Sequence, residues 1–283
     1  MTLTCTDPSE VNDIIIDAKG AGSIPSITVM AKFQSCVAKN KNLPALHQKI
    51  PKAGEKAENT AWTVWTWQEY YDQCMSFAKG LVSIGFEAHD CINILGFNAP
   101  EWFFANFGAI AAGGVSAGIY TTNAPEACKY VSEHSRAKVV VVEGKKQLDK
   151  YLAIAKDLKH LKAIVVYGEP VPAGLDCEVP IYSFADFCDL GKSVEQDKID
   201  ERINGQAAGE CCTLIYTSGT TGNPKAVMIS NDNLCWTSAT MMGTIDPLGP
   251  KDCLVSYLPL SHIAAQMLDM HCPMVSGSQV FFA

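Results

Sequence analysis

Residues 216–225 read Tyr-Thr-Ser-Gly-Thr-Thr-Gly-Asn-Pro-Lys and follow directly on an apolar run at 211–215. These ten residues contain four hydroxyl side chains besides the tyrosine, two glycines and one lysine. Glycine lets backbone N–H groups turn toward an anion without a Cβ in the way, hydroxyls donate to phosphate oxygens, and lysine supplies a compact positive charge. The stretch therefore predicts a phosphate-binding loop that follows a buried strand.

Two other interpretations of this loop are weaker. A Walker A loop has four residues between its first glycine and its closing Gly-Lys-Ser/Thr, whereas Gly219 and Gly222 are separated by two residues and a proline precedes Lys225. A flexible polar turn is the usual explanation of a Gly/Ser/Thr cluster. A turn does not need donors of three kinds together with a lysine, and a candidate helix cap at 230–231 gives the loop the context of a strand before it and a helix after it.

The chain upstream of the loop alternates apolar segments with amphipathic ones. Strands are expected at 91–97, 115–120, 138–142 and 163–167, and the helices between them begin at Pro100, Pro125 and Gln147. Nearly continuous hydrophobic strands separated by helices indicate an α/β protein with largely parallel sheets that helices cover on both faces. Ligands of such sheets bind beyond the carboxyl ends of the strands, and the loop at 216–225 follows such an end.

The segments on either side of this alternation are less regular. The first 60 residues have no sustained period, which predicts an arm along the surface with one helix near 27–38. Aromatic and β-branched residues in near alternation at 62–67 indicate a strand, and residues 69–84 indicate a helix that ends at a glycine. An acidic connector punctuated by proline and glycine follows at 168–209.

Composition restricts the class of protein. Of the 283 residues, 48% are hydrophobic and 18% are charged, which is enough for a substantial core. A formal net charge of −8 and a pI near 5.2 argue against a nucleic-acid partner, because nucleic-acid binders display a basic stripe. The twelve cysteines form no Cys-x-x-Cys pair and no Cys/His cluster of metal-ligand spacing, so we expect free, mostly buried thiols and no protein-bound metal.

Neither a secretory signal nor a membrane span is expected. The first ten residues lack a basic segment followed by an apolar core. Residues 102–120 carry no charge over about the length that a bilayer requires, but the pair Gly113-Gly114 divides them into a helix and a short strand. The sequence favours a cytoplasmic protein and leaves peripheral contact with the endoplasmic reticulum or another intracellular membrane open.

The loop closely resembles the signature of the adenylate-forming superfamily, Tyr-Thr-Ser-Gly-Thr-Thr-Gly-x-Pro-Lys-Gly, which acyl-CoA synthetases, luciferases and peptide-synthetase adenylation domains share. Residues 256–266, Ser-Tyr-Leu-Pro-Leu-Ser-His-Ile-Ala-Ala-Gln, resemble the next core motif of these enzymes. Residues 118–126, Gly-Ile-Tyr-Thr-Thr-Asn-Ala-Pro-Glu, resemble a segment of long-chain fatty acyl-CoA synthetases. From about residue 63 onward the chain is most similar to the bubblegum-type branch of those synthetases.

One position departs from the signature. Ala226 stands where the family has its closing glycine. If that position needs positive φ or a close approach of backbone to nucleotide, the methyl group would cost stability or affinity.

The resemblance implies the amino-terminal domain of an adenylate-forming enzyme, with two stacked αβ subdomains. It implies an arm at 1–60, a first subdomain with its acidic connector at 61–209, and the start of a second subdomain with the phosphate loop at 210–283. The family's adenine-binding segment, its ribose-binding aspartate and its carboxy-terminal domain have no counterpart in this sequence. We therefore interpret the chain as a truncated domain.

The resemblance also implies the roles of individual residues. The β- and γ-phosphates of ATP would be held by Thr217, Ser218, Gly219, Thr220, Thr221 and Gly222. Lys225 would contact the departing pyrophosphate, Mg²⁺ would bridge phosphate oxygens, and His262 would orient the substrate carboxylate. The other five histidines are interpreted as structural.

The first hypothesis is a long-chain fatty acid–CoA ligase, present here as an amino-terminal fragment that is inactive alone. Such an enzyme converts a long-chain fatty acid and ATP into an acyl-adenylate and then transfers the acyl group to CoA. Two alternatives stay open: a non-catalytic truncated product or pseudoenzyme of the same family, and an adenylating enzyme for another carboxylate. The preferred chain length of the acid does not follow from this sequence.

Overall fold

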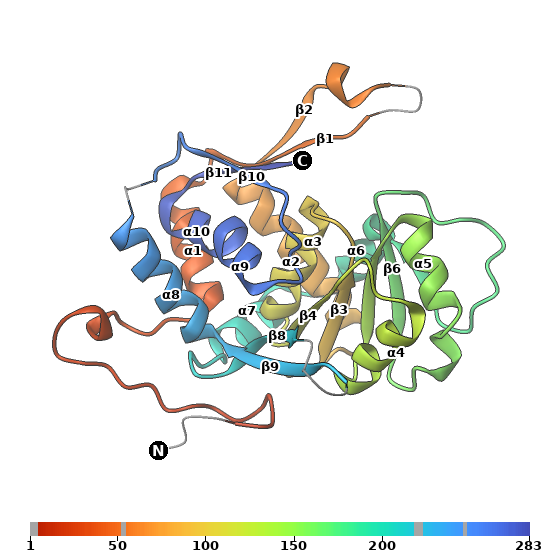
Figure 1. Ribbon diagram of the computed structural model, residues 1–283, viewed down its shortest axis with the longest axis horizontal. Helices are drawn as coiled ribbons and strands as arrows, with labels where there is room; N and C mark the ends of the chain where they lie inside the picture. Colours follow the sequence, from red (N-terminus) through yellow and green to blue (C-terminus); the bar gives the residue numbers. More distant parts are fainter. Residues whose placement is uncertain (1–4, 52–54, 218–222, 246–247) are drawn as a thin grey trace.

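The computed structural model describes residues 5–51, 55–217, 223–245 and 248–283. Its strands form a seven-stranded and a four-stranded sheet, and one set of helices lies between the two sheets (Figure 1). A second set of helices covers the far face of the larger sheet. This arrangement confirms the predicted α/β fold with stacked, largely parallel sheets.

The larger sheet has the strand order β7-β6-β5-β3-β4-β8-β9 and is parallel except for β9. Its strands are β3 (Cys91–Leu95), β4 (Val115–Ile119), β5 (Val139–Glu143), β6 (Ala163–Tyr167), β7 (Ile181–Ser183), β8 (Cys211–Thr217) and β9 (Lys225–Ser230). In β5, Val139 and Val141 pack into one core while Val140 and Val142 pack into the other. A strand buried on both faces has no polar face, which is why its sequence is a continuous apolar run.

Helices cover both faces of this sheet. One face packs against α2 (Trp67–Ser83), α3 (Pro100–Ala111), α6 (Phe184–Leu190) and α7 (Gln196–Asn204), and the other against α4 (Pro125–His134) and α5 (Gly144–Leu152). The uncharged stretch at 102–120 is α3 followed by β4, as predicted. No helix in the described part of the chain is both long and apolar enough to span a bilayer.

The smaller sheet joins residues from both ends of the chain. Its order is β10-β11-β1-β2, formed by β10 (Cys253–Ser256), β11 (Gln279–Phe282), β1 (Pro44–Lys49) and β2 (Trp62–Thr66). Helix α2 contacts β1 and β2 of this sheet. On the same side of the sheet lie α1 (Val29–Asn40), α9 (Ile263–Gln266) and α10 (Cys272–Ser276), and α8 (Asn231–Thr244) packs against α1 and α10 (Figure 1). The predicted division of the chain at 1–60, 61–209 and 210–283 stays a prediction. The pairing of β1 with β11 joins residues of the first of these segments to residues of the last.

The first described residues lie on the surface, and the arm at 1–60 stays a prediction. Residues 5–28 run along the outside of the molecule as a largely extended segment (Figure 1). The Asn12 N–H donates to the Gly209 carbonyl at 3.2 Å, and Trp236 Nε1 donates to the Ala21 carbonyl at 2.9 Å. The helix predicted near 27–38 is α1, whose amino terminus is capped by the Thr28 hydroxyl.

The cysteines are free thiols, and eight of the twelve are buried, which confirms the prediction. Burial raises the pKa of the Cys91 thiol to about 12. Buried thiols of this kind are unreactive, so these cysteines contribute to packing.

Candidate functional site

The predicted phosphate loop connects β8 to β9. Because β8 lies parallel to β4, its carboxyl end is at the edge where sheets of this type bind ligands. The chain then turns back, and Lys225, the first residue of β9, lies directly opposite Thr217. The sequence does not predict this hairpin, because the short apolar run at 226–229 stands between a loop and a helix cap and shows no period of its own.

Two of the predicted phosphate ligands are described in the structure. Thr217 and Lys225 are both exposed, and neither side chain has a hydrogen bond or ion pair with any described residue. Ser218, Gly219, Thr220, Thr221 and Gly222 lie outside the described residues. Beneath the loop, Tyr130 Oη donates to the Pro224 carbonyl at 3.0 Å. The hairpin thus presents an exposed lysine opposite Thr217, with no ion pair to any described residue.

The segment that carries His262 crosses the carboxyl half of β4. Gly118 in β4 permits the crossing, because a Cβ at this position would come within 2.8 Å of Ser261 Cα. Since β4 pairs with β8, the crossing brings this segment beside the strand that leads into the phosphate loop. Two motifs that are distant in sequence therefore meet at one edge of the sheet.

His262 is the N-cap of α9. Its Nδ1 accepts a hydrogen bond from the Ala264 N–H at 3.1 Å. A ring whose Nδ1 accepts carries its proton on Nε2, so the exposed ring presents an N–H donor. A donor of this kind suits a carboxylate oxygen, and the role of His262 in substrate binding stays a prediction.

A buried polar network lies beneath the segment that precedes His262. Asn98 Nδ2 donates to Ser256 Oγ and to the Leu258 carbonyl, each at 2.8 Å. Ser256 Oγ in turn donates to Asp269 Oδ2 at 2.8 Å. Burial raises the pKa of the Asp269 carboxyl to about 6, although the Ser256 hydrogen bond lowers it. These hydrogen bonds hold the segment that precedes His262 in a fixed position over the carboxyl edge of the sheet.

Ser256 begins the motif at 256–266, whereas neither Asn98 nor Asp269 stands in a motif that the sequence marks. Asn98 stands just beyond a buried strand, a position from which polar side chains reach ligands in α/β sheets, and this signal could have indicated it. Asp269 lies in a single π-helical turn, Met267–His271, inside an apolar run. No pattern in the sequence marks that turn, although such turns are frequent at functional sites.

Ala226, the departure from the signature, is accommodated without strain. It lies in β9 opposite Tyr216. Among the described residues other than glycine, positive φ occurs at His89 and Arg136 alone, so Ala226 does not need the freedom of glycine. Its methyl group packs against the core around β8. The effect of this methyl group on the approach of a nucleotide stays a prediction.

Comparisons with known sequences place this site in a family. The sequence matches the AMP-binding enzyme family over residues 33–283. The long-chain-fatty-acid–CoA ligase ACSBG2 of Xenopus laevis is 41% identical over 271 residues, which cover 95% of this chain and 35% of that protein. The long-chain-fatty-acid–CoA ligase ACSBG1 of Mus musculus is 44% identical over 259 residues, which cover 90% of this chain and 34% of that protein. The chain thus spans about a third of the length of these curated relatives.

Solved structures share the fold. The anthranilate CoA ligase AuaEII, in complex with anthranoyl-AMP, superposes with a TM-score of 0.71 at 21% identity over 93% of this chain and 46% of that chain. The didomain of a carboxylic acid reductase from Segniliparus rugosus, in complex with AMP, gives a TM-score of 0.72 at 18% identity over 92% of this chain and 40% of that chain. With the sequence match over 33–283 and the signature loop on the β8–β9 hairpin, the chain belongs to the AMP-binding enzyme family, and its relatives include bubblegum-type long-chain acyl-CoA synthetases.

Proposed function

We propose that the whole protein activates a long-chain fatty acid with ATP and transfers the acyl group to CoA. The observation that carries this proposal is the meeting of the β8–β9 hairpin and the His262 segment at the carboxyl edge of one sheet. The relatives named as long-chain-fatty-acid–CoA ligases support the choice of substrate. This chain would supply the part of the site that holds phosphate and orients the carboxylate.

Adenylation is mainly a matter of positioning and charge neutralisation around phosphates. The exposed ammonium group of Lys225 would contact the departing pyrophosphate, and the hydroxyls and backbone N–H groups of 217–222 would donate to the β- and γ-phosphates. Mg²⁺ bound with the nucleotide would neutralise part of the phosphate charge. In the described part of the chain no group of three His, Cys, Asp or Glu side chains could hold a metal, so the nucleotide would supply its ligands.

His262 would orient the acid. Its Nε2–H would donate to one carboxylate oxygen and leave the other oxygen to attack the α-phosphate. The hydrogen bonds of Asn98 with Ser256 and Leu258 would keep the His262 ring in a fixed position at the carboxyl edge of the sheet. Positioning of this kind contributes to rate because the reacting atoms start close together.

Exposed apolar side chains beside His262 suit a fatty acyl chain. Tyr257 and Leu258, which precede His262, are 61% and 38% exposed, and Phe97, next to Asn98, is 41% exposed. Large apolar side chains grouped on a surface mark binding sites. Because fatty acids partition into membranes, we include peripheral contact of a cytoplasmic protein with the endoplasmic reticulum or another intracellular membrane in the proposal.

The experiment uses the full-length protein that contains this chain. It is incubated with ATP, Mg²⁺, CoA and either palmitate or benzoate, and acyl-CoA and AMP are measured. We expect palmitoyl-CoA, an increased KM for ATP in Lys225→Ala, and a loss of kcat/KM for palmitate of roughly a hundredfold in His262→Ala. Lys192→Ala, at an exposed lysine paired with Asp189, is the matched control and should leave the kinetics unchanged.

The two competing proposals predict different products. Benzoyl-CoA without palmitoyl-CoA would assign the protein to another carboxylate. Absence of AMP and acyl-CoA with either acid would favour a non-catalytic member of the family and would overturn the proposed function.

A further inference from the structure

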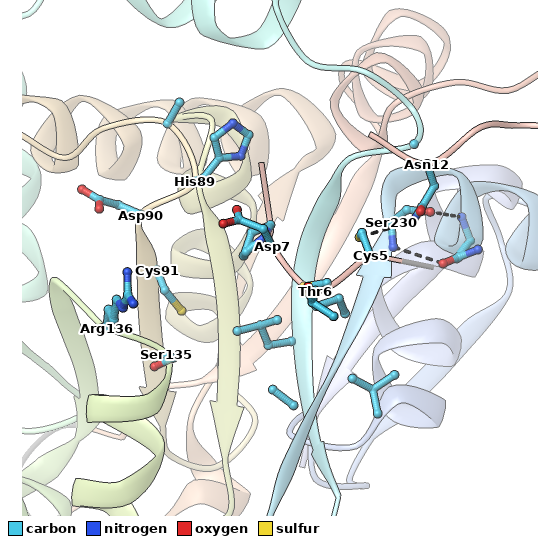
Figure 2. A pocket seen from close by; sticks show the side chains of 18 of the residues that line it. Cys5, Thr6, Asp7, Asn12, His89, Asp90, Cys91, Ser135, Arg136 and Ser230 are labelled. Atoms are coloured by element: carbon cyan, nitrogen blue, oxygen red, sulfur yellow. Dashed lines mark hydrogen bonds between the residues drawn. The ribbon is translucent and has the colours of Figure 1, made fainter. Parts of the chain in front are cut away.

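A cleft of about 1090 Å³ lies at the amino ends of strands in the seven-stranded sheet (Figure 2). Its walls come from the loops before β3, β5 and β6, from β9 with the start of α8, and from the amino-terminal segment. The phosphate loop follows the carboxyl end of β8 and therefore belongs to the opposite edge. A cleft of this volume is large enough for a nucleotide-sized ligand.

Three basic side chains hold equivalent positions along this edge. The hydrogen-bonded register aligns one residue in each of β3, β5 and β6: Ile92, Val139 and Ala163. His89, Arg136 and His160 each stand three residues before the aligned position of their strand, and all three line the cleft. Because neighbouring parallel strands begin at the same edge, the three residues form a row, which we call the basic row.

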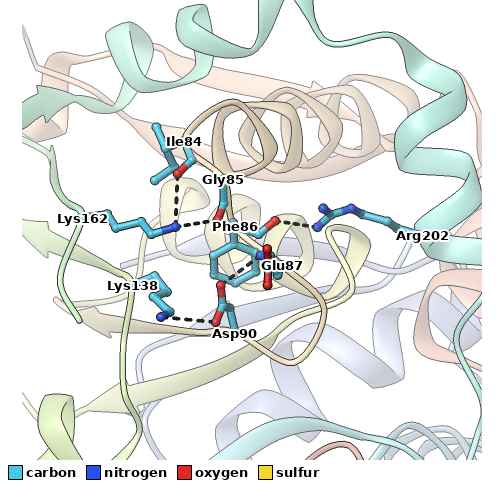
Figure 3. A network of polar contacts seen from close by, with 8 residues as sticks. All are labelled: Ile84, Gly85, Phe86, Glu87, Asp90, Lys138, Lys162 and Arg202. Atoms are coloured by element: carbon cyan, nitrogen blue, oxygen red, sulfur yellow. Dashed lines mark hydrogen bonds and ion pairs between the residues drawn. The ribbon is translucent and has the colours of Figure 1, made fainter.

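Cations from other segments fix the turn that carries His89 (Figure 3). Lys162 and Arg202 donate to backbone carbonyls of this turn at 2.6 Å and 2.8 Å. Lys138 Nζ lies 3.7 Å from a carboxylate oxygen of Asp90 in the same turn. His89 is therefore held in place before any ligand arrives.

The backbone at two members of the basic row is strained. His89 has a φ of 65° and Arg136 a φ of 52°, the two positive values among described residues other than glycine. Arg136 follows the C-cap of α4, and the Ala137 N–H after it donates to the Ser132 carbonyl at 3.0 Å. Glycine usually occupies this position because a Cβ is disfavoured there. The backbone conformation at the end of α4 favours glycine, so it does not account for the arginine at position 136.

The guanidinium of Arg136 is not used to hold the described part of the fold together. The chain has two arginines, and Arg202 uses its guanidinium on the carbonyls of Phe86 and Ala112. Arg136 makes no side-chain hydrogen bond or ion pair with any residue that the structure describes. The planar donors of a guanidinium match phosphate and carboxylate oxygens.

A carboxylate from the amino-terminal segment faces the basic row. Figure 2 shows Asp7 directed toward the turn that carries His89. Hydrogen bonds from Ser9 lower the pKa of the Asp7 carboxyl, and the charges of His89 and Arg136 lower it further. Asp7 thus marks the place that an anion would take.

We propose that the basic row is a second anion-binding site, which holds the phosphate group of a soluble small molecule between the Arg136 guanidinium and the imidazoles of His89 and His160. In the free protein the Asp7 carboxylate faces the turn that carries His89, so the ligand would displace Asp7 and the arm that carries it. Three other carboxylates line the cleft and restrict the phosphate to the part next to the row: Asp13, Asp90 and Asp232.

The test titrates inorganic pyrophosphate into residues 1–283 carrying Lys225→Ala, a change that removes the lysine of the phosphate loop. Affinity is measured by calorimetry, and the histidine rings are followed by ¹H–¹³C NMR. We expect shifts of the His89 and His160 rings and a loss of affinity of roughly tenfold or more in Arg136→Gly. The melting temperature of Arg136→Gly should stay equal or rise, because glycine fits a positive φ.

Two further variants complete the design. Asp7→Asn should tighten pyrophosphate binding about threefold, because it removes the competing charge. Lys192→Gln removes an exposed positive charge that does not line the cleft and should leave the affinity unchanged. Equal affinity in Arg136→Gly and its parent, or no ring shift at saturating pyrophosphate, would overturn the second site. Since every protein in this series lacks Lys225, the result is independent of the proposed function.

Discussion

The two edges of the seven-stranded sheet are built from different polar groups. At the carboxyl edge, the amide of Asn98 and the hydroxyl of Ser256 hold the segment before His262, and the cation Lys225 is exposed. At the amino edge, cations hold the turn before β3: Lys138, Lys162 and Arg202. A chain with a net charge of −8 thus gathers several cations at one edge, among carboxylates such as Asp90, and overall composition does not reveal this grouping.

The two edges also differ in whether their cations already have partners within the protein or are available to bind a ligand. Most cations of the amino edge are already bound to backbone carbonyls or to Asp90, and they stabilise the turn. At the carboxyl edge, the network of Asn98, Ser256 and Asp269 does not involve Lys225, whose ammonium group has no ion pair with any described residue. We therefore expect substitutions at the two edges to affect different properties of the protein.

Asp269 gives the largest expected change in stability. Folding raises the pKa of its carboxyl from 3.8 to about 6, so its contribution to stability is fully present below about pH 4 and is lost as the pH rises through 6. Asp269→Asn should raise the free energy of unfolding by up to about 3 kcal/mol at pH 8 and have little effect near pH 4. Urea denaturation at both values measures this difference, and a gain that does not depend on pH would contradict the burial of a charged carboxylate.

Arg202 tests the opposite edge. Its guanidinium donates to the carbonyls of Phe86 and Ala112, so Arg202→Met leaves two carbonyls unpaired and should lower the free energy of unfolding by about 2 kcal/mol. Lys192→Met is the matched control, because that lysine pairs with Asp189 in solvent. If urea denaturation gave the same midpoint for both variants, the cations of the amino edge would not stabilise the turn.

Ala226 gives the smallest expected change. Because its φ is not positive, Ala226→Gly should lower stability by about 0.4–1 kcal/mol through a more flexible unfolded chain. The ATP KM of the full-length protein should stay the same. A clear decrease in KM would instead show that the methyl group obstructs the nucleotide.

The larger part of the fold could be predicted from the sequence. Strands β3 to β6 are nearly continuous apolar runs separated by helices, two of which begin at proline, and each of these features is local. The strand β9 could not be predicted, because its pairing with β8 depends on a turn and not on a period of its own. The same holds for β1, which pairs with a strand at the other end of the chain.

The candidate sites divide in the same way. The phosphate loop and His262 stand in contiguous motifs, so the sequence indicates both. Asn98, Ser256 and Asp269 come from three separate elements and meet only in the folded chain. The basic row likewise requires the register of three strands, which no single stretch of sequence contains.

The central claim is that the carboxyl edge binds the phosphates of a nucleotide through Lys225. The most direct measurement is calorimetric titration of Mg-ATP into residues 1–283 and into the Lys225→Ala and Arg136→Gly variants. We expect the parent protein to bind Mg-ATP weakly. Lys225→Ala should reduce the affinity by roughly tenfold, whereas Arg136→Gly should keep the part of the affinity that the phosphate loop contributes. Equal affinity of the parent protein and Lys225→Ala would contradict the claim and would remove Lys225 from the nucleotide site.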